Sequence, residues 1–217
     1  MPTTLLNDDG TASMATLLMS SHHAFRRDLA CLAAALANDQ APRDLLAAEW
    51  THLRSALHGH HTIEDTAMFP GLRAEHPDVA ATIDELQEQH RRIDPLLERG
   101  DLAFADLGQH RAAARDVVIA LEALLAMHLE LEEQTITPYL RANKEFPAPA
   151  DDAALAMYAD GFAWSMAGIA PHVNARIEAM LPPGLRARLP AARAAFDERC
   201  VRVWGRAHAH VSTTSAS

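Results

Sequence analysis

The chain has 217 residues and a mass of 23.6 kDa, which suits one domain, or one domain with an appendage, and allows a sizeable buried core. Hydrophobic residues make up 49% and aromatic residues only 5%, with much Ala and Leu and little Gly, a composition that favours helices over a sandwich or barrel. A formal net charge of −10 disfavours binding to phosphate backbones and anionic membranes, so neither nucleic acid nor a membrane is an expected partner.

Apolar residues recur at helical spacing in four long segments. Pro42 suits the first position of the second helix, and Asp106 with Gln109 three residues later matches a capping box for the fourth. These segments predict an all-α fold built as a four-helix bundle. The predicted helices cover about residues 13–38, 42–73, 78–97 and 106–143.

A turn-rich stretch, residues 146–150, separates this bundle from a C-terminal region. We expect a bundle domain over residues 13–145 and a helical extension over residues 151–210 that packs on it. The extension is the natural candidate for a lid over one end of the bundle, or for contact with a protein partner. Its predicted helices cover residues 152–167, 171–181 and 184–208.

Two further features concern the cellular compartment. Cys31 and Cys200 lie far apart in apolar, helix-like surroundings, and residues 1–10 are polar and show no secretory segment. The richest apolar run, residues 117–127, is too short for a membrane span and contains Glu122. We therefore expect a soluble protein of the reducing cytoplasm.

Each predicted helix of the bundle carries a histidine within its apolar stripe, where the period calls for a hydrophobic residue. Their imidazoles should therefore point to the bundle interior. Burying one polar ring without a partner costs about 1 to 3 kcal/mol, so something in the interior must satisfy these rings. The four residues are His22, His60, His90 and His128.

A 68-residue repeat relates the two halves of the predicted bundle. The halves look like copies of one helical hairpin, each with a His followed 38 residues later by His-x-x-x-Glu. The repeat pairs His22 with His90, His60 with His128, Glu64 with Glu132, Leu57 with Leu125, Leu29 with Leu97 and Pro70 with Pro138.

The His-x-x-x-Glu spacing has a physical interpretation. Residues four apart stand one above the other on a helix, so His60 with Glu64, and His128 with Glu132, can each direct a nitrogen and a carboxylate at one point. With one more His from each remaining helix, four imidazoles and two carboxylates suit two ions bridged by both glutamates. Mixed nitrogen and oxygen ligands with an open position favour iron over structural zinc, although ligand type alone leaves manganese and zinc open.

The order His, His-x-x-x-Glu, His, His-x-x-x-Glu on four helices resembles the hemerythrin and HHE cation-binding family. The stretch HHAFRRDL around His22 is similar to the first-helix motif of bacterial, notably actinobacterial, members. HHTIEDTAMFP and HLELEEQTITP are similar to the second-helix and fourth-helix patterns of the family. The resemblance covers about residues 13–143 and implies an up-down-up-down four-helix bundle.

The resemblance also implies a carboxylate-bridged, non-haem pair of iron ions with an oxo or hydroxo bridge. A vacant position on this pair would take up dioxygen, nitric oxide or peroxide. The implied terminal ligands are His22, His60, His90 and His128, and the implied bridging ligands are Glu64 and Glu132.

The sequence departs from oxygen-carrier hemerythrins at Asp94, where those proteins carry a second third-helix histidine. Either Asp94 ligates or one iron keeps a water there, and both alternatives weaken the case for simple oxygen transport. We expect a protein that binds dioxygen, nitric oxide or peroxide in redox sensing or in protection against oxidative stress. The alternative is a diiron enzyme with peroxidase or catalase-like activity. A third hypothesis is a metal-free helical module.

Three neighbours of these residues are interpreted as lying outside the ligand set. His23 and His61 each follow a predicted ligand and point about 100° away around the helix, as flanking groups or groups that contact a ligand from outside. His22 is preferred to His23 because Phe25 shares its face. Asp65 shares a side with polar and charged residues, which indicates a solvated face.

Overall fold

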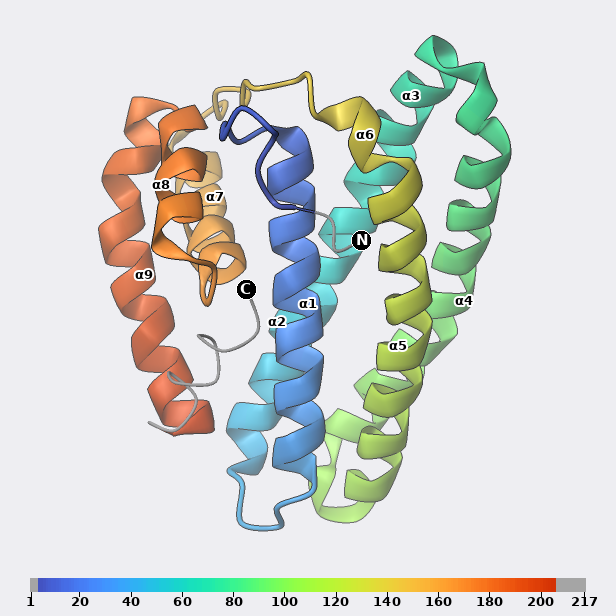
Figure 1. The fold of residues 1–217 in the computed structure, drawn as a ribbon. Coiled ribbons are helices and arrows are strands. Elements are labelled where there is room, and N and C mark those ends of the chain that lie inside the picture. Colours follow the sequence, from blue (N-terminus) through green and yellow to red (C-terminus); the bar gives the residue numbers. More distant parts are fainter. Residues whose placement is uncertain (1–3, 206–217) are drawn as a thin grey trace. The chain divides into compact units, whose positions relative to one another are not determined.

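A computed structural model describes residues 4–205, and every regular element among them is a helix or a helical turn. The prediction of an all-α fold is therefore confirmed. A π-helical turn, η1 (Glu64–Met68), follows the second helix, and a 3-10 turn, η2 (Pro77–Val79), precedes the fourth. Within the described residues, no helix combines the length and hydrophobicity that a membrane span requires. Figure 1 shows the helices, which in chain order are α1 (Met14–Leu36), α2 (Arg43–Ile63), α3 (Phe69–Glu75), α4 (Ala80–Ala105), α5 (Leu107–Thr135), α6 (Thr137–Leu140), α7 (Asp152–Met166), α8 (Pro171–Met180) and α9 (Pro183–Trp204).

Two compact units make up the chain. The central unit is Phe25–Ile136, and the terminal unit combines Met1–Ala24 with Thr137–Ser217. These boundaries differ from the expected division near residues 145–151, because the residues before the central unit group with the C-terminal helices. Residues 206–210 of the expected extension lie outside the described part of the chain.

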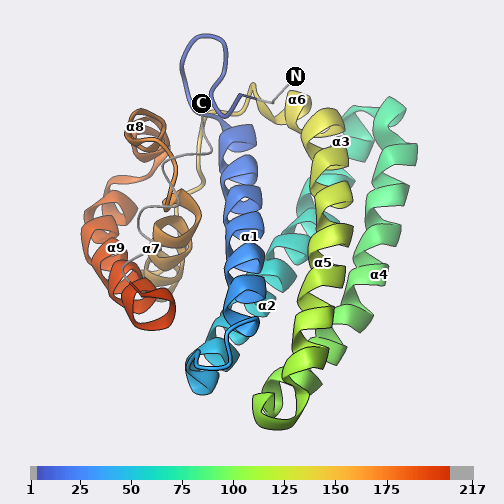
Figure 2. The same cartoon turned by 60° about the horizontal axis from the view of Figure 1, so that its bottom comes forward.

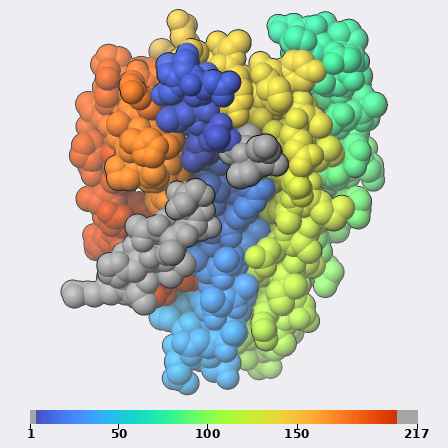
Figure 3. All heavy atoms as spheres, viewed as in Figure 1, coloured from blue at the N-terminus to red at the C-terminus, as the bar shows by residue number. Residues whose placement is uncertain are grey.

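The central unit contains α2, α4, α5 and the part of α1 that begins at Phe25. Helices α4 and α5 lie side by side in opposite directions in both ribbon views, with Asp106 between them in sequence (Figures 1 and 2). The Asp106 side chain accepts a hydrogen bond from the backbone N–H of Gln109 at 3.2 Å, so the predicted cap is confirmed. In the space-filling view the surface atoms of α4 and α5 adjoin, which covers the interior on this side (Figure 3).

The apolar stripes predicted from the sequence form the interior of the central unit. Most of their side chains are buried, because each stripe recurs at the helical period and faces neighbouring helices. Burial of this apolar surface is the main favourable term in the unit's stability. The largest fully buried side chains include Phe25, Leu29, Leu46, Trp50, Leu53, Leu57, Ile83, Leu86, Ile93 and Leu121.

Three helices differ from their predicted courses. The predicted fourth helix runs on to about residue 143, whereas α5 ends at Thr135 and the short helix α6 follows it. The predicted second helix runs on to about residue 73, whereas η1 interrupts it in the structure. The predicted third helix ends near Leu97, whereas α4 continues past Pro95 to Ala105. Pro95 removes one backbone hydrogen bond, but the residues after it bury apolar side chains such as Phe104, and this packing maintains the helix.

The terminal unit has an apolar core of its own. Helices α7, α8 and α9 contribute most of the buried side chains, and Ala12, just before α1, joins them. Phe162 and Met166 from α7, Ile177 from α8 and Leu185 from α9 are members of this core. The predicted C-terminal helices therefore form a packed structure and not a loose tail.

The end of α4 packs very closely on α2. A Cβ added at Gly100 would lie 2.0 Å from the Trp50 ring, which also stacks on Phe104 with ring centroids 4.7 Å apart. The Trp50 indole N–H donates to Asp101 at 3.0 Å, which restrains the ring. We expect Gly100→Ala to lower the free energy of unfolding by about 1–3 kcal/mol, measured by urea unfolding.

Gly59→Ala on α2 is the matched control, because nothing lies within 4 Å of a Cβ added at Gly59. At such an open helical position the change should stabilise the protein by up to about 1 kcal/mol, since Ala has the higher helix propensity. A stabilising effect of Gly100→Ala as well would contradict the close packing between Gly100 and Trp50.

Candidate metal centre

The end of α2 and the first residue of η1 supply three donor residues to one buried region. His60 and His61 are neighbours, and Glu64 follows them by four and three residues, so it lies within one helical turn of both. His60 Nε2 lies 2.9 Å from Glu64 Oε1. His61 and Glu64 are only 7% and 1% exposed. Two adjacent imidazoles can therefore face two directions with one carboxylate between them.

Helices α4 and α5 supply the opposite side of this region. His90 from α4 and His128 from α5 are buried, and their Nε2 atoms are 3.3 Å apart. The second oxygen of Glu64, Oε2, lies 3.5 Å from His90 Nε2. Glu132, one turn after His128, is fully buried, with Oε2 3.8 Å from His128 Nε2. The two oxygens of Glu64 thus face different histidines, His60 on one side and His90 on the other.

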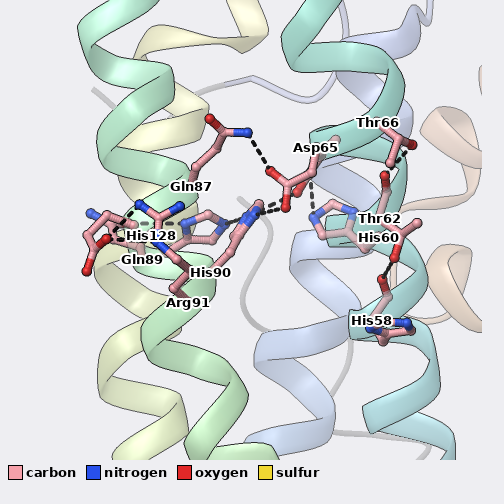
Figure 4. Close-up of polar contacts among 12 residues, drawn as sticks. His58, His60, Thr62, Asp65, Thr66, Gln87, Gln89, His90, Arg91 and His128 are labelled. Atoms are coloured by element: carbon pink, nitrogen blue, oxygen red, sulfur yellow. Dashed lines mark hydrogen bonds and ion pairs between the residues drawn. The ribbon is translucent and has the colours of Figure 1, made fainter.

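The side chains of Asp65 and Gln89 contact the Nδ1 atoms of His90 and His128, on the opposite side of each ring from the other donor atoms. His90 Nδ1 lies 3.0 Å from a carboxylate oxygen of Asp65, and His128 Nδ1 lies 3.1 Å from Gln89 Oε1. Gln89 donates through Nε2 to Glu85, which orients Oε1 toward His128. These oxygens accept hydrogen bonds, so an imidazole that donates to them from Nδ1 turns its Nε2 lone pair inward. Figure 4 shows Asp65 reaching from η1 to His90, with His128 beyond that ring.

The donor atoms form two groups that share one carboxylate. Within each group, one donor atom of every residue lies within 4.8 Å of the others. Ligands bound to one ion at about 2.0–2.2 Å are at most about 4.4 Å apart, so each group suits one ion after a small adjustment. The first group is His22, His60, Glu64 and Glu132, and the second group is His61, Glu64, His90 and His128.

All six residues predicted as ligands occur in these two groups, and their binding of metal stays a prediction. His22 is the member of the first group that α1 supplies, and it is fully buried, whereas His23 belongs to neither group. His22 stands one helical turn before Phe25, whose ring centroid lies 5.2 Å from that of His60. The apolar face that favoured His22 over His23 in the sequence is therefore the buried face of α1.

Two residues differ from their interpretation in the sequence, and the structure bears on the alternatives left open for a third. His61, interpreted as a flanking group, belongs to the second group, because its position on α2 faces α4 and α5. Asp65, interpreted as part of a solvated face, contacts His90 and accepts a hydrogen bond from Gln87. Asp94 is exposed and belongs to neither group, so the alternative in which it ligates is not supported.

The electrostatics of the site favour a bound cation. Burial raises the pKa of Glu64 well above its ordinary value, and the nearby carboxylates of Glu132 and Asp65 raise it further. A cation reverses both effects, because it supplies positive charge where the carboxylates lack solvent. The Nε2 atoms of His90 and His128 are 3.3 Å apart, close enough for both to bind one positive ion between them. Imidazole and carboxylate donors without thiolates fit iron, zinc or manganese.

Asp65 should influence how tightly the second group could hold an ion. Removing a hydrogen-bond partner of a metal-binding imidazole generally lowers metal affinity by about 10–100-fold. We expect that loss for Asp65→Ala, measured by competition between the protein and a chelator for ferrous iron. Asp65→Asn keeps an oxygen acceptor for His90 and should lose less.

Glu88→Ala is the control for this measurement. Glu88 lies on the exposed side of α4, where it forms an ion pair with Arg91, so its removal should leave the iron affinity unchanged. Wild-type affinity in both Asp65 variants would show that His90 needs no support from that carboxylate.

Comparison with models of protein families gives a match over the helical region that carries the site. Residues 13–140 match the family described as Hemerythrin HHE cation binding domain. This span is more than half of the chain and includes every donor residue of the two groups. Comparisons with curated proteins and with solved structures found no match.

Proposed function

Because the chain belongs to the hemerythrin HHE cation-binding family, we propose that it is a non-haem diiron protein that binds dioxygen, nitric oxide or peroxide in redox sensing or protection. In this proposal each candidate group holds one iron, and an oxo or hydroxo bridge joins the two ions. The four long helices form an up-down-up-down bundle around them. The protein works in the cytoplasm, and its ligand is a diatomic molecule or peroxide.

One observation carries the proposal. The carboxylate of Glu64 has one oxygen beside His60 and the other beside His90, and Glu64 belongs to both candidate groups. A carboxylate placed in this way can bridge two cations, as carboxylates do in helical bundles that hold metal pairs. Iron bound there would supply redox chemistry and an open coordination position for a small ligand.

The residues around the donors prepare the site for such a ligand. Phe25 and Phe69 are almost fully buried and lie beside His60 and His90, with ring centroids 5.2 and 5.9 Å apart respectively. These aromatic rings exclude water from the donors, which strengthens electrostatic interactions and limits side reactions. Asp65 lies 3.0 Å from the outer nitrogen of His90 and can accept a hydrogen bond from it, which leaves the inner nitrogen available to a cation.

The enzyme alternative loses part of its support. It depends on an incomplete set of histidines, with Asp94 in the place of one. His61 adds a third imidazole to the group that contains His90 and His128, so that group has no shortage of nitrogen donors. Reversible binding of a small ligand is therefore the function that the site supports best.

Iron analysis and a visible spectrum of the purified protein test the proposal. We expect two iron ions per chain, one for each group, and an absorption band that changes when dioxygen, nitric oxide or peroxide is added. Following oxygen release after addition of hydrogen peroxide separates the two functions. A binding protein gives a spectral change without sustained turnover, whereas a catalase-like enzyme releases oxygen continuously.

Two ligand variants accompany this measurement. His60→Ala and Glu132→Ala should each lose iron, because both residues belong to the first group. Retention of two ions per chain in either variant would refute the ligand assignment. A wild-type protein that binds no iron would refute the proposed function itself.

A further inference from the structure

We propose that His61 is a further metal ligand, which binds the same ion as Glu64, His90 and His128. The inference rests on the proposed function, since it assigns one more residue to one of the two ion positions. The repeated pattern of six ligands does not contain His61, because the pattern takes one histidine from each helix.

His61 lies among the imidazoles of two predicted ligands. Its ring stacks on that of His90, with centroids 3.9 Å apart and 19° between the planes, and meets the His128 ring edge-on at 5.4 Å. One nitrogen of each ring and one oxygen of Glu64 lie within 4.8 Å of one another, and all four residues are buried. Three imidazoles and one carboxylate in this space form a complete four-donor set for one ion.

Helix geometry explains how two consecutive histidines both reach the interior. Neighbouring residues on a helix point about 100° apart. His60 packs on Phe25 of α1, whereas His61 packs on His90 of α4, and the two histidine ring centroids are 5.7 Å apart. Glu64 is four residues from one and three from the other, so it lies between the two directions. The histidine pair therefore serves two ions and not one.

The residues that could compete for this role face elsewhere. Asp94, one turn after His90 on α4, is exposed, and Asp65 is bound to the outer nitrogen of His90. His61 is thus the fourth donor residue of the second group, beside Glu64, His90 and His128. With it, the second group has three nitrogen donors and one oxygen donor, a composition that suits iron better than manganese.

His61→Ala tests the inference in the full-length protein loaded with ferrous iron. We expect the variant to bind about half as much iron as the wild type, with a changed visible spectrum, while the metal-free variant keeps the wild-type circular dichroism. Added imidazole should restore the iron and the spectrum, because it can enter the space that the side chain leaves. A purely structural role of His61 would not respond to imidazole. His58→Ala, an exposed histidine on the same helix, is the matched control and should bind iron as the wild type does.

A second variant, His61→Gln, keeps a polar side chain and guards against misfolding of the alanine variant. It should also lose about half of the iron. Two ions per chain with the wild-type spectrum in either folded variant would overturn the inference. That result would leave the proposed function intact if the wild type binds two ions, whereas a wild type without iron would count against the proposed function instead.

Discussion

Glu64→Gln should abolish the binding of both ions. Glu64 is shared by the two candidate groups, and its two oxygens face His60 and His90. Removing the hydrogen-bond partner of a metal ligand already lowers metal affinity by about 10–100-fold. Removing the shared ligand itself should therefore lower the iron affinity by more than about 100-fold at each ion position. Iron per chain after equilibration with ferrous iron and gel filtration measures the effect.

Glu122→Gln is the control for this variant, because Glu122 is an exposed carboxylate on α5 outside both groups. It should bind as much iron as the wild type. Should Glu64→Gln keep one tightly bound ion, one group would be shown to bind without the shared carboxylate, and the idea that Glu64 bridges two ions would be wrong.

The metal-free Glu64→Gln protein should be more stable than the metal-free wild type at neutral pH. The pKa of Glu64 is raised well above its ordinary value of 4.5 by burial, by Glu132 and by Asp65, so the folded state binds this proton more tightly than the unfolded state does. The stabilisation from that proton is complete below about pH 4.5 and is lost as the pH rises through the folded-state pKa. The neutral amide of Gln has no such loss, so the free energy of unfolding of the variant should exceed that of the wild type by on the order of 1–3 kcal/mol near pH 7.

Urea unfolding of both metal-free proteins between about pH 4 and pH 8 measures this difference. The free energies of unfolding should be similar at the acidic end and diverge as the pH rises. With ferrous iron added at neutral pH, the wild type should become the more stable of the two proteins, because only the wild type gains stability by binding the ion. A difference that is constant with pH would contradict the raised pKa of Glu64.

The helical period explains why the sequence alone predicts where the buried cluster lies. A histidine that replaces a hydrophobic residue in a regular stripe must share the stripe's direction, and His22, His90 and His128 are all buried accordingly. The helix pattern also predicts the approximate positions of the long helices, although not where each of them ends. Neither result needs knowledge of how one helix meets another.

What the sequence does not predict depends on contacts between helices. His61 is 100° away from a predicted ligand on its own helix, and only the positions of α4 and α5 show that this direction also faces the interior. Asp65 meets His90 from 25 residues away in the chain. The extension of α4 depends on the burial of Phe104 against Trp50, which local propensity does not include.

The 68-residue repeat is broken at one point inside the donor cluster. His61 in the first hairpin corresponds to Leu129 in the second, and Leu129 is fully buried. Two identical hairpins would offer a pair of equivalent ion positions related by a half-turn. If His61 binds as proposed, this single difference between the hairpins makes the positions chemically distinct, because one group has three imidazoles and one carboxylate and the other has two of each. In such an inequivalent pair, one ion can stay firmly bound while the other binds the incoming small molecule.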